Sequence, residues 1–442
     1  MLRHTHFTHM HSGGLAAGVV GTEDAALPKQ IYADNAIPGE EALVEMLRRQ
    51  RGFRQGVVRE LVSPSPSRVV PFCPHSNICG GCNWQHIDYP TQLYWKQQIL
   101  VDALSKYEIV TPLVPNVIPS PLQQGYRNKS EYAFSSLPEP VFGFHSKDDR
   151  SQVFACQTCS LQAPYVHRIA QKIFGLALEM QIPFYQYFDR SGLLKALQIR
   201  TTTLGETLCI LIFSEEPAKE SIHGFFTRLR QEAPTVTGWF YQFNQNCIHV
   251  GGAEKLTETI DELNFRYSPQ SFFQPNPLQA AALYRQVKEY AALTGSETVY
   301  DLYTGIGSIA CYVAKEAKQV FGIEGNATAI MDANDNAKLN NLNNTQFITG
   351  DILETYRPDF IDSHPQADVI ILDPPRSGTL IEIKKVILYA APQKIIYVSC
   401  NPVSLAWDLK QLCAGGYHVT AIQPFDMFPH THHVETVCLL EH

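Results

Sequence analysis

Acidic and thiol side chains stand where the sequence predicts buried strands to end. Apolar runs such as QFITGD, DVIILD and KIIYVSC each close on a residue that can do chemistry. The carboxyl ends of parallel strands meet at one edge of a sheet, and ligands bind in the crevice outside that edge. The sequence therefore predicts one crevice that holds a thiol and several carboxylates. The residues concerned are Glu324, Asp351, Asp373, Cys400 and Glu435.

Cys400, in the motif SCNP, is the predicted nucleophile. A thiolate that adds to carbon 6 of uracil makes carbon 5 able to attack an electrophilic methyl group, and a base must then remove the proton from carbon 5. This chemistry needs a cysteine, a sulfonium methyl donor and a carboxylate, for which we expect Glu435 in HTHHVETV. The alternative is that Cys400 is a small buried hydrophobe. Asp373 and Glu435 at the same edge favour the catalytic interpretation.

A glycine turn is predicted at the cofactor end of the sheet. DLYTGIGSIA places Gly305 and Gly307 between a strand and a helix, where the lack of side chains lets the backbone approach a ligand. Glu324 ends the next strand and can accept both hydroxyls of a ribose. These features suit either a dinucleotide or S-adenosylmethionine. Cys400 and the DPPR motif at Asp373 favour S-adenosylmethionine, because a dehydrogenase has no need of a cysteine followed by Asn-Pro.

The elements that position these residues fall into three sections of chain. Residues 261–442 alternate strands and helices, which indicates a parallel sheet covered on both faces. Residues 69–260 mix short strands and helices, including an amphipathic helix over residues 90–104. Residues 1–68 contain short apolar runs bounded by Gly and Pro, which are typical of a small β-barrel. We predict an α/β protein with an N-terminal barrel, a central α+β domain and a C-terminal Rossmann-like domain.

Composition limits the class of protein further. The chain has 442 residues, 45% hydrophobic and 18% charged, which fits two or three globular domains. No apolar run is long enough for a membrane span, and the first residues lack the apolar core of a signal peptide. We therefore expect a cytoplasmic protein with no membrane partner and, by default, a monomer. The net charge of −8 argues against a protein that coats itself in nucleic acid.

A group of cysteines predicts a metal centre. Cys73, Cys79 and Cys82 have C-x5-C-x2-C spacing, and CQTCSLQAP offers a fourth thiolate. Four sulfurs suit either zinc or an iron–sulfur cluster, and the spacing alone favours zinc, because paired C-x2-C halves are common in zinc sites. Disulfides are not expected in a cytosolic chain. The alternative to a metal centre is therefore a set of free thiols that lie close together by coincidence.

Four motifs resemble those of the RNA 5-methyluridine methyltransferases. They are DLYTGIG, DPPR, SCNP and HHVET, and the resemblance covers nearly the whole chain. It implies that Cys400 is the nucleophile and Glu435 the base. It also implies that Phe272 and Asn276 shape the floor of the pocket. The cofactor contacts that it implies are Gln274, Tyr303, Glu324, Asp351 and Asp373.

The N-terminal half is similar to the branch of this family that modifies ribosomal RNA. In that branch the cysteine motif holds a four-iron, four-sulfur cluster, which here implies a structural centre that leaves Cys156 outside the ligand set. The first section resembles the TRAM domain, a small RNA-binding β-barrel, through AIPGE and SPSPSRVVPFCPH. Barrel and cluster together imply 23S ribosomal RNA rather than transfer RNA as the substrate. The implied ligands are Cys73, Cys79, Cys82 and Cys159.

The resemblance predicts that two basic stretches of the sequence bind RNA. Five arginines and no acidic residue lie between Met46 and Arg59, and GYRNKSEYAF carries Arg127 and Lys129 beside Tyr126. We expect the cations to contact phosphates and the tyrosine to stack on a base. The structural alternatives are a solvated helix face for the first stretch and a basic loop paired with the acidic surface for the second.

Three other functions remain alternatives. An amino-nitrogen methyltransferase needs no covalent cysteine, so it would keep its activity in Cys400→Ala. An RNA-binding module with an inactive transferase domain would bind RNA without turnover. A nicotinamide enzyme would bind a dinucleotide.

Overall fold

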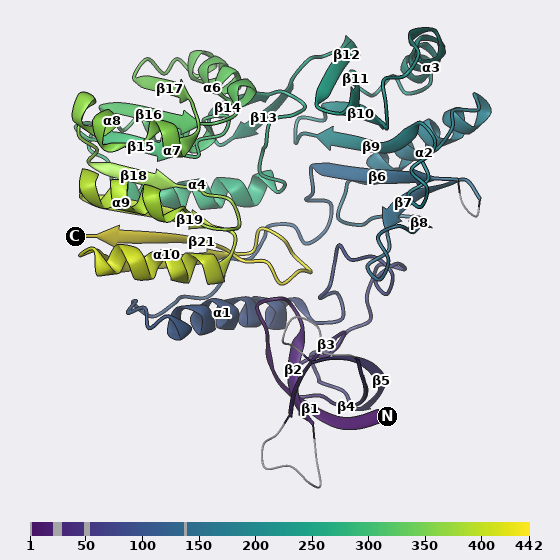
Figure 1. Cartoon of the computed structure of the whole chain (residues 1–442), viewed down its shortest axis with the longest axis horizontal. Coiled ribbons are helices and arrows are strands. Elements are labelled where there is room, and N and C mark those ends of the chain that lie inside the picture. The colour runs from purple at the N-terminus through teal and green to yellow at the C-terminus, as the bar shows by residue number, and fades with distance from the viewer. Residues whose placement is uncertain (1, 21–28, 48–53, 137–138) are drawn as a thin grey trace.

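The chain begins with a closed five-stranded barrel. The computed structural model describes residues 2–20, 29–47, 54–136 and 139–442. The barrel strands follow the order β1-β2-β3-β5-β4, and Phe7, Ile31 and Val44 are fully buried inside. The predicted barrel is confirmed (Figure 1). Its strands are β1 (Leu2–Met10), β2 (Ala16–Val20), β3 (Lys29–Asp34), β4 (Glu41–Met46) and β5 (Gln55–Ser63).

A seven-stranded sheet occupies the central section. Its order is β12-β11-β10-β9-β6-β7-β8, and helices α2 and α3 bury Ile173 and Phe225 in the same core as its strands. The section therefore has the mixed content that the sequence predicted. Its elements are β6 (Lys129–Ser135), β7 (Val141–His145), β8 (Val153–Ala155), α2 (Pro164–Glu179), β9 (Leu194–Thr201), β10 (Thr207–Phe213), α3 (Lys219–Glu232), β11 (Gly238–Phe243) and β12 (Asn246–Gly252).

The C-terminal section is a sheet with helices on both faces, in the order β17-β16-β15-β18-β19-β21-β20. Alternate residues of a strand point to opposite faces, so Val299 packs in a core with α4 and α5, and Tyr300 in one with α9 and α10. A hairpin of β13 (Leu256–Ile260) and β14 (Leu263–Tyr267) precedes the sheet. The remaining elements are α4 (Pro277–Ala291), β15 (Thr298–Leu302), α5 (Ser308–Ala314), β16 (Gln319–Glu324), α6 (Ala327–Leu339), β17 (Thr345–Thr349), α7 (Ile352–Thr355), α8 (Pro358–Ser363), β18 (Val369–Leu372), α9 (Ile381–Ala390), β19 (Lys394–Ser399), α10 (Pro402–Ala414), β20 (His418–Phe425) and β21 (Glu435–Glu441).

The last strand departs from the predicted parallel arrangement. β21 is antiparallel to both of its neighbours, β19 and β20. The connection from β20 to β21, residues 426–434, contains no helix, and parallel neighbours need a longer crossover than this connection provides. As a consequence β21 starts, rather than ends, at the edge of the sheet where the other strands end, and its first residue is Glu435.

Helix α1 (Tyr89–Lys106) joins the barrel to the C-terminal sheet, as Figure 1 shows. Ile99 on this helix belongs to the barrel core together with Trp84, whereas Leu100 and Leu104 belong to the core of the C-terminal sheet. The amphipathic helix predicted over residues 90–104 is therefore present and packs on two partners. No helix in the described ranges, α1 included, is long and apolar enough to cross a bilayer.

Candidate active site

Three neighbouring strands bring the predicted catalytic residues to one edge of the C-terminal sheet. Asp373 directly follows β18, Cys400 directly follows β19, and Glu435 begins the antiparallel β21. Ser399 pairs with Thr436, so the backbone beside the thiol lies next to the backbone beside the carboxylate. The chain thus places the thiol of Cys400 between two carboxylates that come from separate parts of the sequence.

Cys400 lies half-buried in a cavity of about 210 Å³. The pKa of its thiol is raised to about 12, first by burial and then by the carboxylates of Glu435 and Asp373, whereas Arg376 acts in the opposite direction. Since the thiolate is the nucleophilic form, positive charge near the sulfur activates the residue, and Arg376 supplies such a charge. The cavity is lined by Ser12, Ile99, Arg376, Cys400, Asn401, Pro402, His432 and His433.

Glu435 is buried, and its pKa is raised to about 8. Burial is the main cause and the Asp373 carboxylate the second, whereas Arg376 and Lys96 lower the value. The pKa of Asp373 itself is raised to about 7 by burial. A carboxyl group that titrates near neutral pH can both accept and release a proton during a reaction, which is the property required of a general base.

A buried ion pair anchors the loop of residues 426–434, which leads to Glu435. Lys96 on α1 and Asp426 are fully buried, and Nζ lies 2.5 Å from Oδ1. Tyr89 donates its hydroxyl to the second Asp426 oxygen at 2.8 Å. Sequence analysis missed this pair. A lysine on the apolar stripe of an amphipathic helix is the signal that could have found it, because lysine is almost never buried without a partner.

The middle of the same loop is bound by the segment after the cysteine motif. The N–H of His430 donates to Oε1 of Gln92 at 2.9 Å, and its carbonyl accepts from the N–H of Trp84 at 3.0 Å. Tyr126 is buried and donates its hydroxyl to the carbonyl of Pro429 at 3.3 Å. The prediction that Tyr126 stacks on a base is therefore wrong, because protein encloses its ring.

The glycine turn after β15 has an unusual backbone. Tyr303, Gly305 and Gly307 all adopt positive φ, at 67°, 56° and 74°. A Cβ at Gly305 would meet no atom within 4 Å, so open space faces this residue. Glu324 accepts the N–H of Gly305 at 3.2 Å and that of Asn326 at 2.9 Å, which fixes its carboxylate beside the turn. Open space and a fixed carboxylate at this strand edge fit a nucleoside ligand.

The other predicted pocket residues lie in different surroundings. Gln274 is buried, and its carbonyl accepts from Nδ2 of Asn128 at 2.9 Å. Asn276 is fully enclosed and donates to the carbonyl of Met427 at 3.2 Å, so it supports the loop before Glu435 and does not form an open pocket floor. Phe272, by contrast, is 68% exposed. Asp351 is also exposed and caps α7 through the N–H of Leu353.

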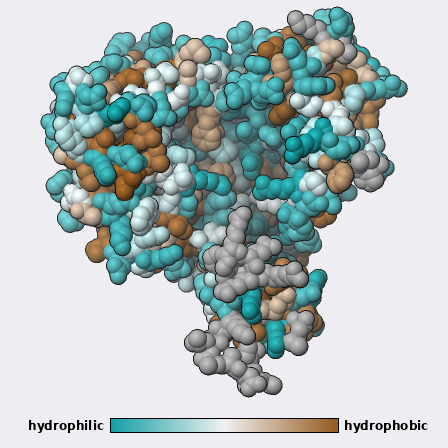
Figure 2. Space-filling view, viewed as in Figure 1, coloured by the Kyte–Doolittle hydropathy of each residue, from teal (hydrophilic) through white to brown (hydrophobic). Residues whose placement is uncertain are grey.

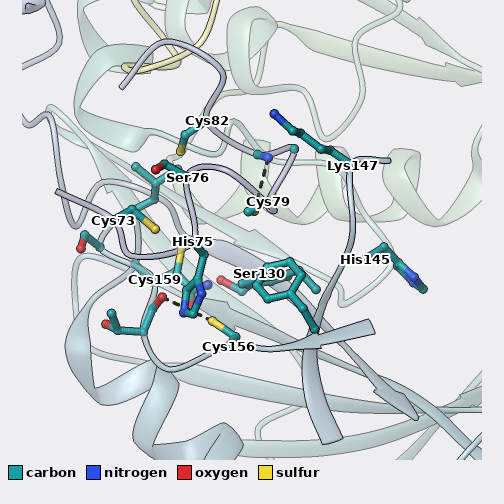
Figure 3. A pocket seen from close by; sticks show the side chains of 18 of the residues that line it. Cys73, His75, Ser76, Cys79, Cys82, Ser130, His145, Lys147, Cys156 and Cys159 are labelled. Carbon is teal, nitrogen blue, oxygen red and sulfur yellow. Dashed lines mark hydrogen bonds between the residues drawn. The ribbon is translucent and has the colours of Figure 1, made fainter. Parts of the chain in front are cut away.

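Five cysteines line a separate cavity of about 580 Å³, shown in Figure 3. Cys73, Cys79 and Cys82 come from the motif before α1, and Cys156 and Cys159 from the segment after β8. The pKa of Cys82 is raised to about 12 by burial and then by its three neighbours Cys159, Cys79 and Cys73. Within the described ranges, no three histidine, cysteine, aspartate or glutamate side chains are arranged to hold a metal ion.

Comparison with known proteins gives consistent results. Residues 252–442 match the family described as tRNA (Uracil-5-)-methyltransferase. RNA methyltransferases of Porphyromonas gingivalis and Bacteroides thetaiotaomicron, both named as uncharacterized, are 38% and 37% identical to the chain; each alignment covers 93% of this chain, and 95% and 96% of those proteins. The crystal structure of Pyrococcus abyssi tRNA (uracil-54, C5)-methyltransferase in complex with S-adenosyl-L-homocysteine has a TM-score of 0.79 at 26% identity and covers 100% of both chains.

The protein is thus an S-adenosylmethionine-dependent RNA methyltransferase. The chain belongs to the RNA (uracil-5-)-methyltransferase family.

The glycine turn gives a prediction about cofactor binding. We expect Gly305→Ala to weaken binding of S-adenosylhomocysteine at least about tenfold, or about 1.4 kcal/mol, because a methyl group would enter the open space that faces this residue. Isothermal titration calorimetry measures the affinity. Gly125→Ala is the matched control, since Gly125 also has positive φ and open space around it but lies outside the sheet edge. Equal affinities for the two variants would contradict the prediction.

Proposed function

We propose that the protein methylates carbon 5 of a uridine in RNA through a covalent bond between Cys400 and carbon 6. The observation that carries the proposal is the placement of Cys400 between Asp373 and Glu435 on neighbouring strands. An amino-nitrogen methyltransferase has no use for a thiol in this position. A single chain supplies all of these residues, which is consistent with a monomer.

The reaction assigns one task to each side chain. The thiolate of Cys400 adds to carbon 6, and the electron pair of the carbon 5–carbon 6 double bond moves to make carbon 5 nucleophilic. S-adenosylmethionine, when bound, supplies the electrophilic methyl group that carbon 5 takes. Glu435 then accepts the proton from carbon 5, the double bond forms again, and the bond between carbon 6 and sulfur breaks to return the thiolate. Arg376 stabilises the thiolate at both ends of the cycle.

We propose cofactor contacts at the predicted positions along the same edge. The open space beside Gly305 can accommodate part of the cofactor, and the fixed Glu324 carboxylate is suited to accept hydrogen bonds from the ribose hydroxyls. The proposed cofactor-binding residues are Gln274, Tyr303, Glu324, Asp351 and Asp373.

For the substrate we propose 23S ribosomal RNA, bound by a TRAM-type barrel and the central section. Figure 2 shows the face between the central and C-terminal sheets hollowed, with mostly hydrophilic side chains in the hollow. Lys129 begins β6 and Arg127 lies two residues before it, and we assign phosphate contacts to both. Of the arginines between Arg48 and Arg59, those at positions 48, 49 and 51 lie outside the described residues. We propose three domains. Residues 1–68 form a TRAM-like RNA-binding barrel, residues 69–260 a central domain with the cysteine cluster, and residues 261–442 the S-adenosylmethionine-dependent methyltransferase domain.

Transfer RNA is the second candidate substrate. The enzyme of Pyrococcus abyssi named for uracil-54 of transfer RNA matches 100% of this chain, so the match includes the barrel and the cysteine section. The presence of these two parts therefore does not by itself exclude transfer RNA.

We propose that Cys73, Cys79, Cys82 and Cys159 hold a four-iron, four-sulfur cluster. The four thiols are among the residues that line one cavity, and their motifs are similar to those of the cluster-binding branch of the family, which is why we prefer a cluster to a zinc ion. Cys156 stands apart because its thiol donates to the carbonyl of Thr158 at 3.3 Å. The role we assign to the cluster is structural.

The proposed reaction predicts the products of three proteins. With labelled S-adenosylmethionine and unmodified ribosomal or transfer RNA, we expect wild type to form 5-methyluridine in 23S ribosomal RNA, as measured by nucleoside analysis. Cys400→Ala removes the nucleophile and should abolish product. Glu435→Gln cannot remove the carbon 5 proton, so it should accumulate a labelled protein–RNA adduct that survives denaturing electrophoresis. Label in transfer RNA alone would select the second substrate, and activity of Cys400→Ala would refute the covalent mechanism.

The reaction also predicts a pH dependence. Glu435 acts as a base only when ionised, so turnover should rise with pH through the pKa of this carboxyl group, which is about 8 in the site without cofactor. Asp373 raises that pKa, so Asp373→Asn should move the midpoint of the rise to lower pH. Turnover at saturating cofactor and RNA measures both profiles. Asp362→Asn is the control, because this exposed aspartate lies on α8 before β18, away from the strand ends that carry Asp373 and Cys400; a shift of the same size there would contradict the assignment.

The cluster proposal predicts the metal content. Anaerobically purified protein should contain about four iron and four acid-labile sulfide per chain. We expect Cys82→Ala to lose this iron, and Cys156→Ala, the matched control from the same cavity, to retain it. Metal analysis that finds zinc and no iron would replace the cluster with a zinc site. Loss of iron in Cys156→Ala would show that the ligand set is wrong.

A further inference from the structure

The N-terminal barrel reaches the cavity that contains Cys400. The turn between β1 and β2, residues 11–15, is closed by a hydrogen bond from the N–H of His11 to the carbonyl of Leu15 at 2.8 Å. Ser12 in this turn lines the same cavity of about 210 Å³ as Cys400 and His433. A segment from the first section of the chain is therefore part of the wall of the proposed active site.

Gly14 of this turn leaves no room for a side chain. It is buried and has a φ of 81°, and a Cβ there would lie 2.6 Å from Nδ1 of His432 and 2.4 Å from Nδ2 of Asn83. Those two side chains are joined to each other by a hydrogen bond of 2.9 Å. The glycine thus allows the barrel backbone to lie directly against His432, three residues before Glu435.

Trp84 ties the same turn to the loop before Glu435. Its indole N–H donates to the carbonyl of Gly14 at 2.9 Å, and its backbone N–H donates to the carbonyl of His430 at 3.0 Å. The indole is fully buried in the core of the barrel. The barrel turn and the loop of residues 426–434 are therefore held by one residue, and a displacement of either reaches the other through short contacts.

We propose that the barrel turn is a positioning element of the active site, in which Gly14 sets the place of His432 and hence of Glu435. This inference rests on the proposed function, because Glu435 matters only if it removes the carbon 5 proton. The barrel then has a task besides binding RNA: it fixes the base for the elimination step, while Ser12 forms the rim past which the uridine enters. Ser12 lines the cavity, and Gly14 lies against His432 of the loop before Glu435.

The test compares Gly14→Ala with Gly39→Ala. Both glycines belong to the barrel section and have positive φ, 81° and 91°, but a Cβ at Gly39 meets nothing within 4 Å. Both positions have positive φ, and they differ in the contacts of the added Cβ with the hydrogen-bonded pair of Asn83 and His432. We expect Gly14→Ala to lower kcat about tenfold to a hundredfold, to keep the KM for RNA, and to accumulate the methylated protein–RNA adduct. Gly39→Ala should behave as wild type in all three measurements.

Two further proteins keep the outcome decisive if Gly14→Ala folds poorly. In an Asn83→Ala, His432→Ala background both close contacts of the added Cβ are removed, so Gly14→Ala should lower kcat much less than it does in wild type. Equal effects in both backgrounds, or a rise in KM without adduct, would overturn the positioning role. Glu435→Gln is assayed beside them. If it traps no adduct, the proposed function fails; if it traps adduct and Gly14→Ala does not, only this inference fails.

Discussion

The ion pair between Lys96 and Asp426 is the contact on which the geometry of the site depends. Two charges in a protein interior stabilise each other only while both are present and in contact, because each alone would cost several kcal/mol of desolvation. Lys96 belongs to α1, the helix that joins the barrel to the C-terminal sheet, and Asp426 opens the loop that leads to Glu435. The proposed base is therefore placed by a helix from outside its own sheet, and a loop without regular structure can present it in one position.

The electrostatics of the edge link cofactor binding to catalysis. The pKa of Cys400 is raised to about 12, that of Glu435 to about 8 and that of Asp373 to about 7, and the first two rise partly because of neighbouring carboxylates. Raised pKa values favour the protonated forms of these groups as long as no positive charge lies nearby. The sulfonium of S-adenosylmethionine is a cation, and an opposite charge nearby favours the ionised form of an acid. Binding of the methyl donor would then favour ionisation of both the proposed nucleophile and the proposed base.

Local sequence patterns were sufficient for much of this architecture. The barrel, the mixed central section and the alternation of strands and helices follow from hydrophobic periodicity and glycine turns, and the strand-end rule brought Asp373 and Cys400 together correctly. The features that sequence reasoning missed depend on contacts between distant segments. The antiparallel direction of β21 depends on a connection without a helix, and the enclosure of Tyr126 depends on the loop packed over it. The pairing of Lys96 with Asp426 joins residues 330 positions apart, a distance over which no local pattern extends.

The contact between the barrel turn and the loop before Glu435 is uncharged. Gly14, Asn83 and Trp84 carry no charge, and burial lowers the pKa of His432 to about 4, so its ring is neutral at physiological pH. Neutral contacts of this kind are insensitive to ionic strength. Contacts of lysine and arginine to phosphates weaken steeply at high salt, because the release of counterions from the RNA then contributes less free energy to binding. Salt concentration should therefore act separately on the two proposed roles of the barrel. Higher salt weakens the proposed phosphate contacts and leaves the contacts that position Glu435 unchanged, so association and chemistry would depend on ionic strength in different ways.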